Sequence, residues 1–537
     1  MDEEFSVDPS QLLEAASGFA RQPGALSDAS AREFLTRFPL PSIISALQTN
    51  ADFPGLENAL VDCLERIFRT KYGASLIPQY MPFVLVGLGA GSQKVRRLAC
   101  VAVLCLLEKT DKWIAVQLVL QHGIYPLLLG CLTDGDEQVS AASTDAIKIL
   151  AGYPEGMGIV FPASANEATH LGNLAANCSS LHDLFLGPVV VDMSQGRVRV
   201  LALIVRLFSI SNSVASELSR SNLLSLLEAE VRNTSDTLVT LSVLELLYEL
   251  VEVQHSAEFL SKTSLLQLLS SIISNRAAES ISRSRAMMIA GRLLSNENAF
   301  AFIDESGVRT VLSAIDKRFE FMESQETNEC EFALEALGQI GSSFQGAKIV
   351  LSTAPPIARR VVDAAFDRQQ HGKQLTALHS LGNIAGETRM ENTVMLNSIA
   401  EENLRSLIYD KASKTSKLTP SGLLLSVLQQ DSEIRIAGYR LISGLVARPW
   451  CLMEIVSRVD IIDILTNRYT ETSKIGMEAR HRCCEAIYRV FASSTELISD
   501  PSFADIASKL GDAIRRDPYG ARKLTEAQPA VVTADRF

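Results

Sequence analysis

The chain has 537 residues, of which 47% are hydrophobic, 21% are charged and 6% are aromatic, as expected for a soluble globular protein with a large aliphatic core. The 50 Lys and Arg against 62 Asp and Glu give a net charge of −12, which excludes a global attraction to nucleic acid or to an anionic membrane. We therefore expect neither of these as a partner.

The N-terminus and the cysteines indicate the compartment. Residues 1–5 are acidic and lack the basic start and apolar core of a signal peptide. The densest apolar run, Leu98 to Leu107, is about half as long as a membrane span. The 9 cysteines form no tight framework and are expected to be free thiols. Together these features predict a cytosolic protein, with the nucleus as the second candidate compartment.

One helical pattern recurs along the chain. Each copy begins with a short polar stretch and continues with apolar residues at i, i+3, i+4 and i+7, the period of a helix with one buried face. The clearest copies place equivalent apolar residues at Val95, Val139, Val198, Leu238, Ile434 and Ala479. Consecutive copies are separated by 44, 59 and 40 residues, and the last two by 45, which fits paired-helix repeats of about 40–47 residues with insertions.

A second apolar segment precedes each of several copies, at residues 123–132, 222–227, 422–428 and 460–465. Asp136 stands where it can cap the helix that follows the first of these segments. A two-helix unit cannot bury its apolar stripe alone, so neighbouring units must stack. The run Phe83 to Val86 resembles a strand but lies where a first helix is due. The predicted fold is all-α, an α-solenoid of about ten HEAT/armadillo-like helix pairs.

The domain organisation follows from these repeats. We expect residues 1–38 to form an irregular N-terminal cap, residues 39–495 the repeat solenoid, and residues 496–537 a C-terminal capping helix and polar tail. Residues 152–165, rich in Gly and Pro, are predicted to break helicity and lengthen one repeat. The polar run Lys411 to Lys417 is predicted to be a loop.

Three motifs that resemble chemical sites have simpler explanations. Gly87 to Gly91 resembles a dinucleotide loop, but Ser92 stands where a third glycine is needed. Gly341 to Lys348 resembles a phosphate-binding loop with its lysine displaced. His481 lies near two cysteines, but zinc requires four ligands and no second pair lies nearby. We therefore expect no catalytic, cofactor or metal site, and no enzyme activity.

Arginines recur near the start of the second helices. In paired-helix solenoids these helices line the concave face, so the arginines fit either of two interpretations. They form a ladder of ion pairs with acidic residues of neighbouring repeats, or they line a basic groove that suits an acidic protein partner. The candidate partner-binding residues are Arg96, Arg97, Arg197, Arg199, Arg283, Arg285, Arg435 and Arg440.

Short motifs carry a resemblance to a known family. They comprise Glu323-Ser324-Gln325, the run Ala336 to Ser342 with Gly346 and Lys348, Arg448-Pro449-Trp450, Tyr469 after the helix at 460–468, Lys474, the helix from Glu478, and Asp517-Pro518-Tyr519. In these residues and in overall length the chain resembles the 26S proteasome non-ATPase regulatory subunit 5 family.

The resemblance implies a function that composition does not show. Members of that family are assembly chaperones of the proteasome regulatory particle. They bind an ATPase subunit of the base through that subunit's C-terminal domain and delay docking on the core particle. The resemblance therefore implies a non-catalytic protein without cofactors. We expect the protein to be a monomer when free. The alternative is a general armadillo-type interaction scaffold, such as a transport or ubiquitin-ligase adaptor.

Overall fold

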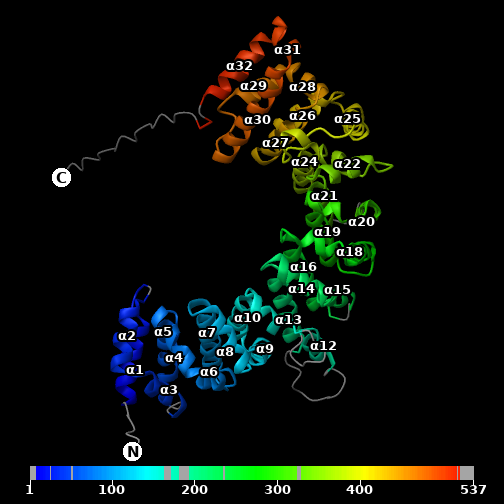
Figure 1. Ribbon diagram of the computed structural model, residues 1–537. Coiled ribbons are helices and arrows are strands. Elements are labelled where there is room, and N and C mark those ends of the chain that lie inside the picture. The colour runs from blue at the N-terminus through cyan, green and yellow to red at the C-terminus, as the bar shows by residue number, and fades with distance from the viewer. Residues whose placement is uncertain are drawn as a thin grey trace, which may run out of the picture. The chain divides into compact units, whose positions relative to one another are not determined.

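A computed structural model describes residues 8–24, 26–49, 53–162, 171–180, 193–233, 236–322, 328–516 and 518–519. Within these residues the regular secondary structure is helical throughout, with no β-strand. The chain divides into two compact units, Met1–Phe259 (unit 1) and Leu260–Phe537 (unit 2), and each is an α-solenoid of stacked helical repeats (Figure 1). The predicted fold class is therefore confirmed.

Unit 1 contains five helix pairs in its described part. Their first and second helices are α3 (Leu40–Thr49) and α4 (Leu56–Phe68), α6 (Met81–Leu88) and α7 (Gln93–Lys109), α9 (Ile124–Asp134) and α10 (Glu137–Ala151), α12 (Leu171–Ser180) and α13 (Met193–Phe208), and α15 (Leu224–Arg232) and α16 (Thr237–Glu252). A further helix precedes each pair: α2 (Asp28–Arg37), α5 (Lys71–Leu76) with η1 (Ile77–Tyr80), α8 (Lys112–Gln121), α11 (Pro154–Val160) and α14 (Asn212–Arg220). Helix α1 (Pro9–Ala20) packs on α4.

Unit 2 repeats the arrangement. Its described pairs are α18 (Leu265–Ser274) and α19 (Ser280–Ser295), α20 (Glu305–Met322) and α21 (Glu329–Ile340), α23 (Ala358–Ala365) and α24 (His371–Ala385), α26 (Pro420–Leu428) and α27 (Ser432–Leu445), and α29 (Val459–Thr466) and α30 (Lys474–Ser493). Helix α17 (Ser256–Leu260), which lies almost wholly within unit 1, precedes the first of these pairs along the chain. The others are preceded by η3 (Glu297–Ala301), α22 (Phe344–Ser352), η4 (Glu391–Thr393) with α25 (Ser398–Ser413), and α28 (Pro449–Val456). The unit closes with α31 (Thr495–Ser499), η5 (Pro501–Phe503) and α32 (Ala504–Arg515).

Polar caps set where the second helices begin. The Asp136 carboxylate accepts a hydrogen bond from the Val139 N–H at 2.8 Å, as predicted, and Asp431 caps α27 in the same way through Ile434 at 3.2 Å. These side chains satisfy N–H groups that have no partner inside the helix. The same local rule therefore starts equivalent helices in both units.

Glycines allow the second helices of unit 2 to pack closely. A Cβ atom on Gly338 of α21 would lie 2.6 Å from the Ser380 Cα of α24, and one on Gly291 of α19 would lie 2.9 Å from the Ala336 Cα of α21. In Figure 1, α19, α21 and α24 follow one side of the unit while α18, α20 and α22 follow the other. The second helices thus form one continuous layer, because each glycine leaves no side chain between neighbours.

The structure agrees with the predicted helix pairs and adds detail at three places. Within the described residues, a further helical segment precedes each pair. Residues 1–38, expected to be irregular, contain the regular helices α1 and α2. The segment 152–165, expected to break helicity, does end α10 at Ala151, but it also contains the short helix α11. Pro154 can begin that helix because a missing N–H costs nothing in the first helical turn. Residues 163–165 of that segment lie outside the described residues.

The structure describes only part of the predicted C-terminal region. The described part of residues 496–537 contains α31, η5 and α32, whereas Asp517 and residues 520–537 lie outside the described residues, as do Glu323, Ser324 and Gln325. The predicted loop at Lys411 to Lys417 begins later than expected, because α25 continues to Ser413. The domain boundaries at 38 and 495 stay predictions.

Candidate functional site

The eight candidate arginines lie on four second helices. Two each belong to α7, α13, α19 and α27. Their surroundings decide how much of each guanidinium remains for a partner.

Five of the eight arginines pair with carboxylates of an adjacent repeat, and the first three are Arg97, Arg197 and Arg440. Arg97 lies 2.8 Å from Glu65 of α4, and Arg197 lies 2.5 Å from Glu230 of α15. Arg440 reaches the carboxylate that follows α24, with 2.8 Å between its Nη2 and Glu387 Oε2. These are the inter-repeat ion pairs of the ladder interpretation.

Arg440 also joins a polar network on α24. Its Nη1 lies 2.6 Å from His379 Nδ1, and its Nη2 donates to Asn383 Oδ1 at 3.3 Å. Burial, and then the positive charge of Arg440, lower the pKa of His379. The imidazole is therefore held neutral, with Nδ1 free to accept the arginine's hydrogen bond.

Arg199 caps the end of a helix in the preceding repeat. Its Nη1 donates to the Gly135 carbonyl at 2.6 Å and lies 3.3 Å from the Thr133 carbonyl, both at the end of α9. Carbonyls at the end of a helix receive no hydrogen bond from an N–H of the same helix, so they need another donor. The helix dipole also favours a positive charge at this end. Arg199 therefore stabilises a repeat boundary without a carboxylate.

Arg283 forms the most buried ion pair of the set. Its Nε and Nη2 donate to the two Glu329 oxygens, each at 2.9 Å, and the two side chains are 8% and 2% exposed. Arg318 Nε donates to the same carboxylate at 2.6 Å, and the Ser280 hydroxyl donates to it at 3.0 Å. Burial alone would raise the pKa of Glu329, but the hydrogen bonds from Arg283 and Arg318 lower it to about 2. The cluster joins α19, α20 and α21.

Arg435 occupies an equivalent position on α27. It pairs with the buried Glu471, and its Nη1 donates to the Gln430 carbonyl at 2.8 Å. The Tyr439 hydroxyl donates to Glu471 at 3.0 Å, and burial followed by that carboxylate raises the pKa of Tyr439. The hydrogen bond that Arg435 donates to Glu471 in turn raises the pKa of Arg435.

Arg96 and Arg285 are half-buried. Arg96 lies beside Cys131 of α9, whose pKa is lowered to about 7 by a hydrogen bond from Cys100 and by Arg96. At least six of the eight arginines contact a neighbouring repeat through hydrogen bonds or ion pairs. Partner binding by these arginines stays a prediction.

Two further arginines of this kind were missed. Arg448 is 1% exposed, and it donates to Glu401 Oε2 at 2.7 Å and to the Ala385 and Gly444 carbonyls at 2.9 and 2.8 Å. Arg389 donates to the Gly341 carbonyl at 2.9 Å, and burial followed by Arg448 lowers its pKa to about 10. Both follow the end of a second helix rather than its start, so a search near helix starts could not find them.

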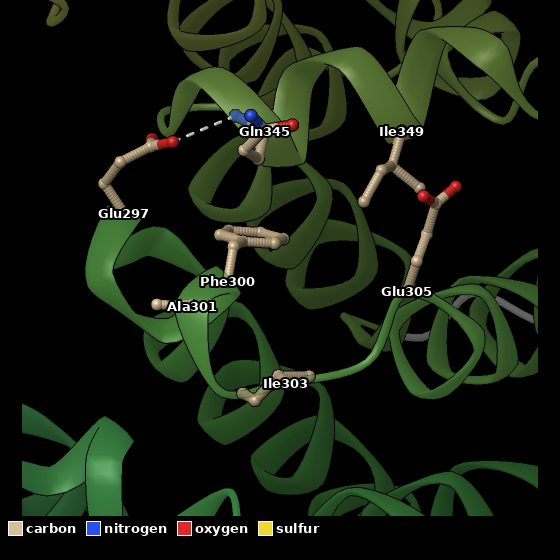
Figure 2. A pocket seen from close by; sticks show the side chains of 7 residues that line it. All are labelled: Glu297, Phe300, Ala301, Ile303, Glu305, Gln345 and Ile349. Carbon is tan, nitrogen blue, oxygen red and sulfur yellow. Dashed lines mark hydrogen bonds between the residues drawn. The ribbon is translucent and has the colours of Figure 1, made fainter.

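A polar pocket of about 340 Å³ lies between η3 and α22. Figure 2 shows Phe300 pointing into it between Glu297 and Glu305. The Glu297 carboxylate accepts hydrogen bonds from the Phe344 N–H at 2.6 Å and the Gln345 N–H at 3.4 Å, and it thereby caps α22. Glu305 pairs with Arg309 at 2.6 Å. Both carboxylates therefore have structural partners.

The three motifs weighed in the sequence occupy ordinary helical positions. Ser92 caps α7, Ser343 caps α22, and His481 lies 3.3 Å from Glu485 on its own helix. Cys483 and Cys484 are buried, and burial raises the pKa of both thiols. Within the described residues, no three His, Cys, Asp or Glu side chains are grouped as metal ligands would be.

One observation concerns apolar helices. Among the described residues, no single helix has both the length and the apolar composition of a membrane span. Helices α8 and α9 taken together have that length and composition, but their axes are bent by 78° at the break between them.

Known proteins resemble the chain over most of its length. The family model described as proteasome non-ATPase 26S subunit matches residues 39–522. The 26S proteasome non-ATPase regulatory subunit 5 of Bos taurus is 21% identical over 475 residues, covering 87% of this chain and 86% of the relative. Its Homo sapiens counterpart is 19% identical over 335 residues, covering 61% and 62%. The structure of Kap121p bound to Pho4p aligns with a TM-score of 0.48 at 14% identity, covering 95% of this chain and 54% of that protein.

Proposed function

The chain belongs to the proteasome non-ATPase 26S subunit family, and from this premise we propose that it is a non-catalytic assembly chaperone of the proteasome regulatory particle. It binds an ATPase subunit of the base through that subunit's C-terminal domain. While bound, it delays docking of the base on the core particle. The match over residues 39–522 is the observation that carries this proposal.

The architecture supports a binding role. A solenoid offers a long surface whose stability is a sum over neighbouring repeats, so a partner can be held along many helices without one central pocket. Delay of docking needs only that the chaperone and the core particle compete for the same end of the ATPase subunit. Such competition requires tight binding and no chemical step.

The proposal includes conditions of action. We propose that the free protein is a monomer that acts in the cytoplasm, with the nucleus as a second compartment. It releases its partner before the regulatory particle is complete, because a chaperone that remained bound would be a permanent subunit.

Co-purification tests the proposal. The tagged full chain is co-expressed with each base ATPase subunit in turn, and with the same subunit lacking its C-terminal domain as the matched control. We expect one intact subunit to be recovered stoichiometrically and its truncated form to be lost. Addition of the chain to that subunit should lower its association with purified core particle.

Two outcomes would contradict the proposal. Recovery of stoichiometric core particle with the tagged chain would show that it belongs to the finished assembly. Recovery of no ATPase subunit under any condition would favour the general armadillo-type scaffold instead.

A further inference from the structure

The first two helix pairs of unit 1 enclose an apolar recess. It has a volume of about 310 Å³ and lies between α3 and α6, with α4 and α7 as its floor. Its walls include Ile44 and Leu47 of α3 and Phe83 and Val86 of α6. Phe83 is 41% exposed and Val86 is 63% exposed, so the α6 wall reaches the surface.

The recess is almost free of charge. Helices α3, η1 and α6 contain no Asp, Glu, Lys or Arg, although 21% of the chain is charged. Its floor includes the buried Leu98, Ala99 and Ala102. Glu57 is the charged residue among those that line it, and one of its oxygens accepts a hydrogen bond from the Ser92 hydroxyl at 2.7 Å.

Helix α6 packs closely on α7 and lines the recess opposite α3. A Cβ atom on Gly87 would lie 3.0 Å from the Ala99 Cβ, so α6 is already seated on the floor. The remaining volume therefore lies between two walls that are each fixed to their own repeat. A cavity of this size falls at the lower end of the range for sites that bind a ligand or a partner's side chains.

The chemistry of the recess selects its occupant. A charged side chain inserted among these residues would lose its hydration without a counter-charge, so the inserted groups must be uncharged. Two facing apolar walls suit a helix that presents large side chains at i, i+3, i+4 and i+7. The carboxylate of Glu57 at one end complements a Lys or Arg that follows these apolar residues.

We propose that the recess between α3 and α6 docks one amphipathic helix of a partner protein, with apolar side chains inserted and a basic residue beside Glu57. The inference rests on the proposed function, because the partner is taken to be the base ATPase subunit. It deepens that function by assigning a contact to unit 1 and to apolar anchoring. The arginines of the second helices are not needed for it.

The test uses the full-length chain and the purified ATPase subunit recovered with it. Val86→Lys places a charge on the rim, where Val86 is 63% exposed and lysine suits the end of a helix. Ile399→Lys on α25 of unit 2 is the matched control, because Ile399 is also 63% exposed. Glu57→Gln removes the carboxylate without filling the recess. Thermal melting of each variant establishes that it is folded.

We expect Val86→Lys to weaken binding of the ATPase subunit about tenfold or more, since a buried charge would oppose insertion. Glu57→Gln should weaken it by a few-fold, with the larger effect at low salt, and Ile399→Lys should leave it unchanged within about twofold. A wild-type chain that binds while Val86→Lys binds equally well overturns this inference and leaves the proposed function intact. A wild-type chain that binds no ATPase subunit overturns both.

Two other occupants would also overturn the inference. If wild type sediments as a dimer and Val86→Lys as a monomer, the recess is an interface between two copies of this chain. If wild type binds phosphatidylcholine vesicles and Val86→Lys does not, the recess faces lipid. The inference requires that both measurements show no difference between the two proteins.

Discussion

Replacement of Glu329 by Gln tests the central claim about the inter-repeat arginines. The substitution keeps the size of the side chain but removes the charge that Arg283 and Arg318 share. The pKa of Glu329 falls from 4.5 to about 2, and one pKa unit corresponds to about 1.4 kcal/mol, so the folded protein favours the carboxylate by about 3 kcal/mol. Removal of one partner from a buried ion pair typically lowers the free energy of unfolding by about 3–5 kcal/mol, which agrees with the value from the pKa shift.

The loss should be local, because a solenoid is stabilised by nearest neighbours. Hydrogen exchange at pH 7 should accelerate about 100-fold in α19 and α21, the equivalent of about 3 kcal/mol, for amides that exchange by opening of these helices. Glu402→Gln is the control, because Glu402 is 65% exposed and pairs with Arg405 at 3.6 Å on the surface of α25. An exposed pair of this kind contributes about 1 kcal/mol at most.

The pH dependence gives an independent check. The pKa of Glu329 is lower in the folded than in the unfolded chain, so its contribution is complete above pH 4.5 and is lost as the pH falls toward 2. Urea unfolding of wild type and Glu329→Gln should therefore differ most at pH 7, and less at pH 3. Equal differences at both pH values, or exchange rates in Glu329→Gln no faster than in Glu402→Gln, would refute the reasoning.

Three further predictions concern packing, titration and the arginines. Gly338→Ala should lower stability by about 1–3 kcal/mol, because its Cβ would collide with α24, whereas Gly130→Ala on α9 has open space and should be neutral or stabilising in a thermal melt. The pKa of His379 is lower in the folded than in the unfolded chain, so its contribution to stability is present above pH 6.5 and is lost as the pH falls below that value. The melting temperature of His379→Gln should therefore depend less on pH between 5 and 7 than that of wild type. Arg199→Glu should lower the melting temperature, because it removes the cap of α9, and a variant that melts normally but associates more slowly with the ATPase subunit would instead favour the basic groove. Arg440→Glu should behave in the same way, and its hydrogen exchange should rise first in α24 and α27.

Local signals in the sequence predict the helices well. Asp136 and Asp431 are recognisable as caps because the side chain and the N–H that it satisfies lie two or three residues apart. The apolar period then fixes which face of each helix is buried. The helices that precede each pair were harder to find, since α11 and α28 are short and begin at proline, which reads as an interruption.

The arginine contacts could be predicted only as a class. Arg283 and Glu329 are 46 residues apart, and Arg448 and Glu401 are 47 apart, so the repeat length implies that partners exist but not which residues they are. The recess between α3 and α6 had no signal of its own. In the sequence, the wall helices α3 and α6 show the same apolar pattern as helices with a buried face. The recess between them depends on the spacing of the two repeats, which the sequence does not reveal.

The glycine contacts and the buried arginines have a mechanical consequence for unit 2. A change in curvature must shorten or lengthen the spacing between adjacent second helices. At Gly338 and Gly291 the backbones of neighbouring helices are already in contact, so a shorter spacing would cause steric clashes. The bidentate ion pair of Arg283 with Glu329 opposes a longer spacing. We therefore expect the stretch from α19 to α24 to respond to force as a stiff rod. Under tension it should yield by the loss of whole repeats in discrete steps rather than by gradual elastic stretching.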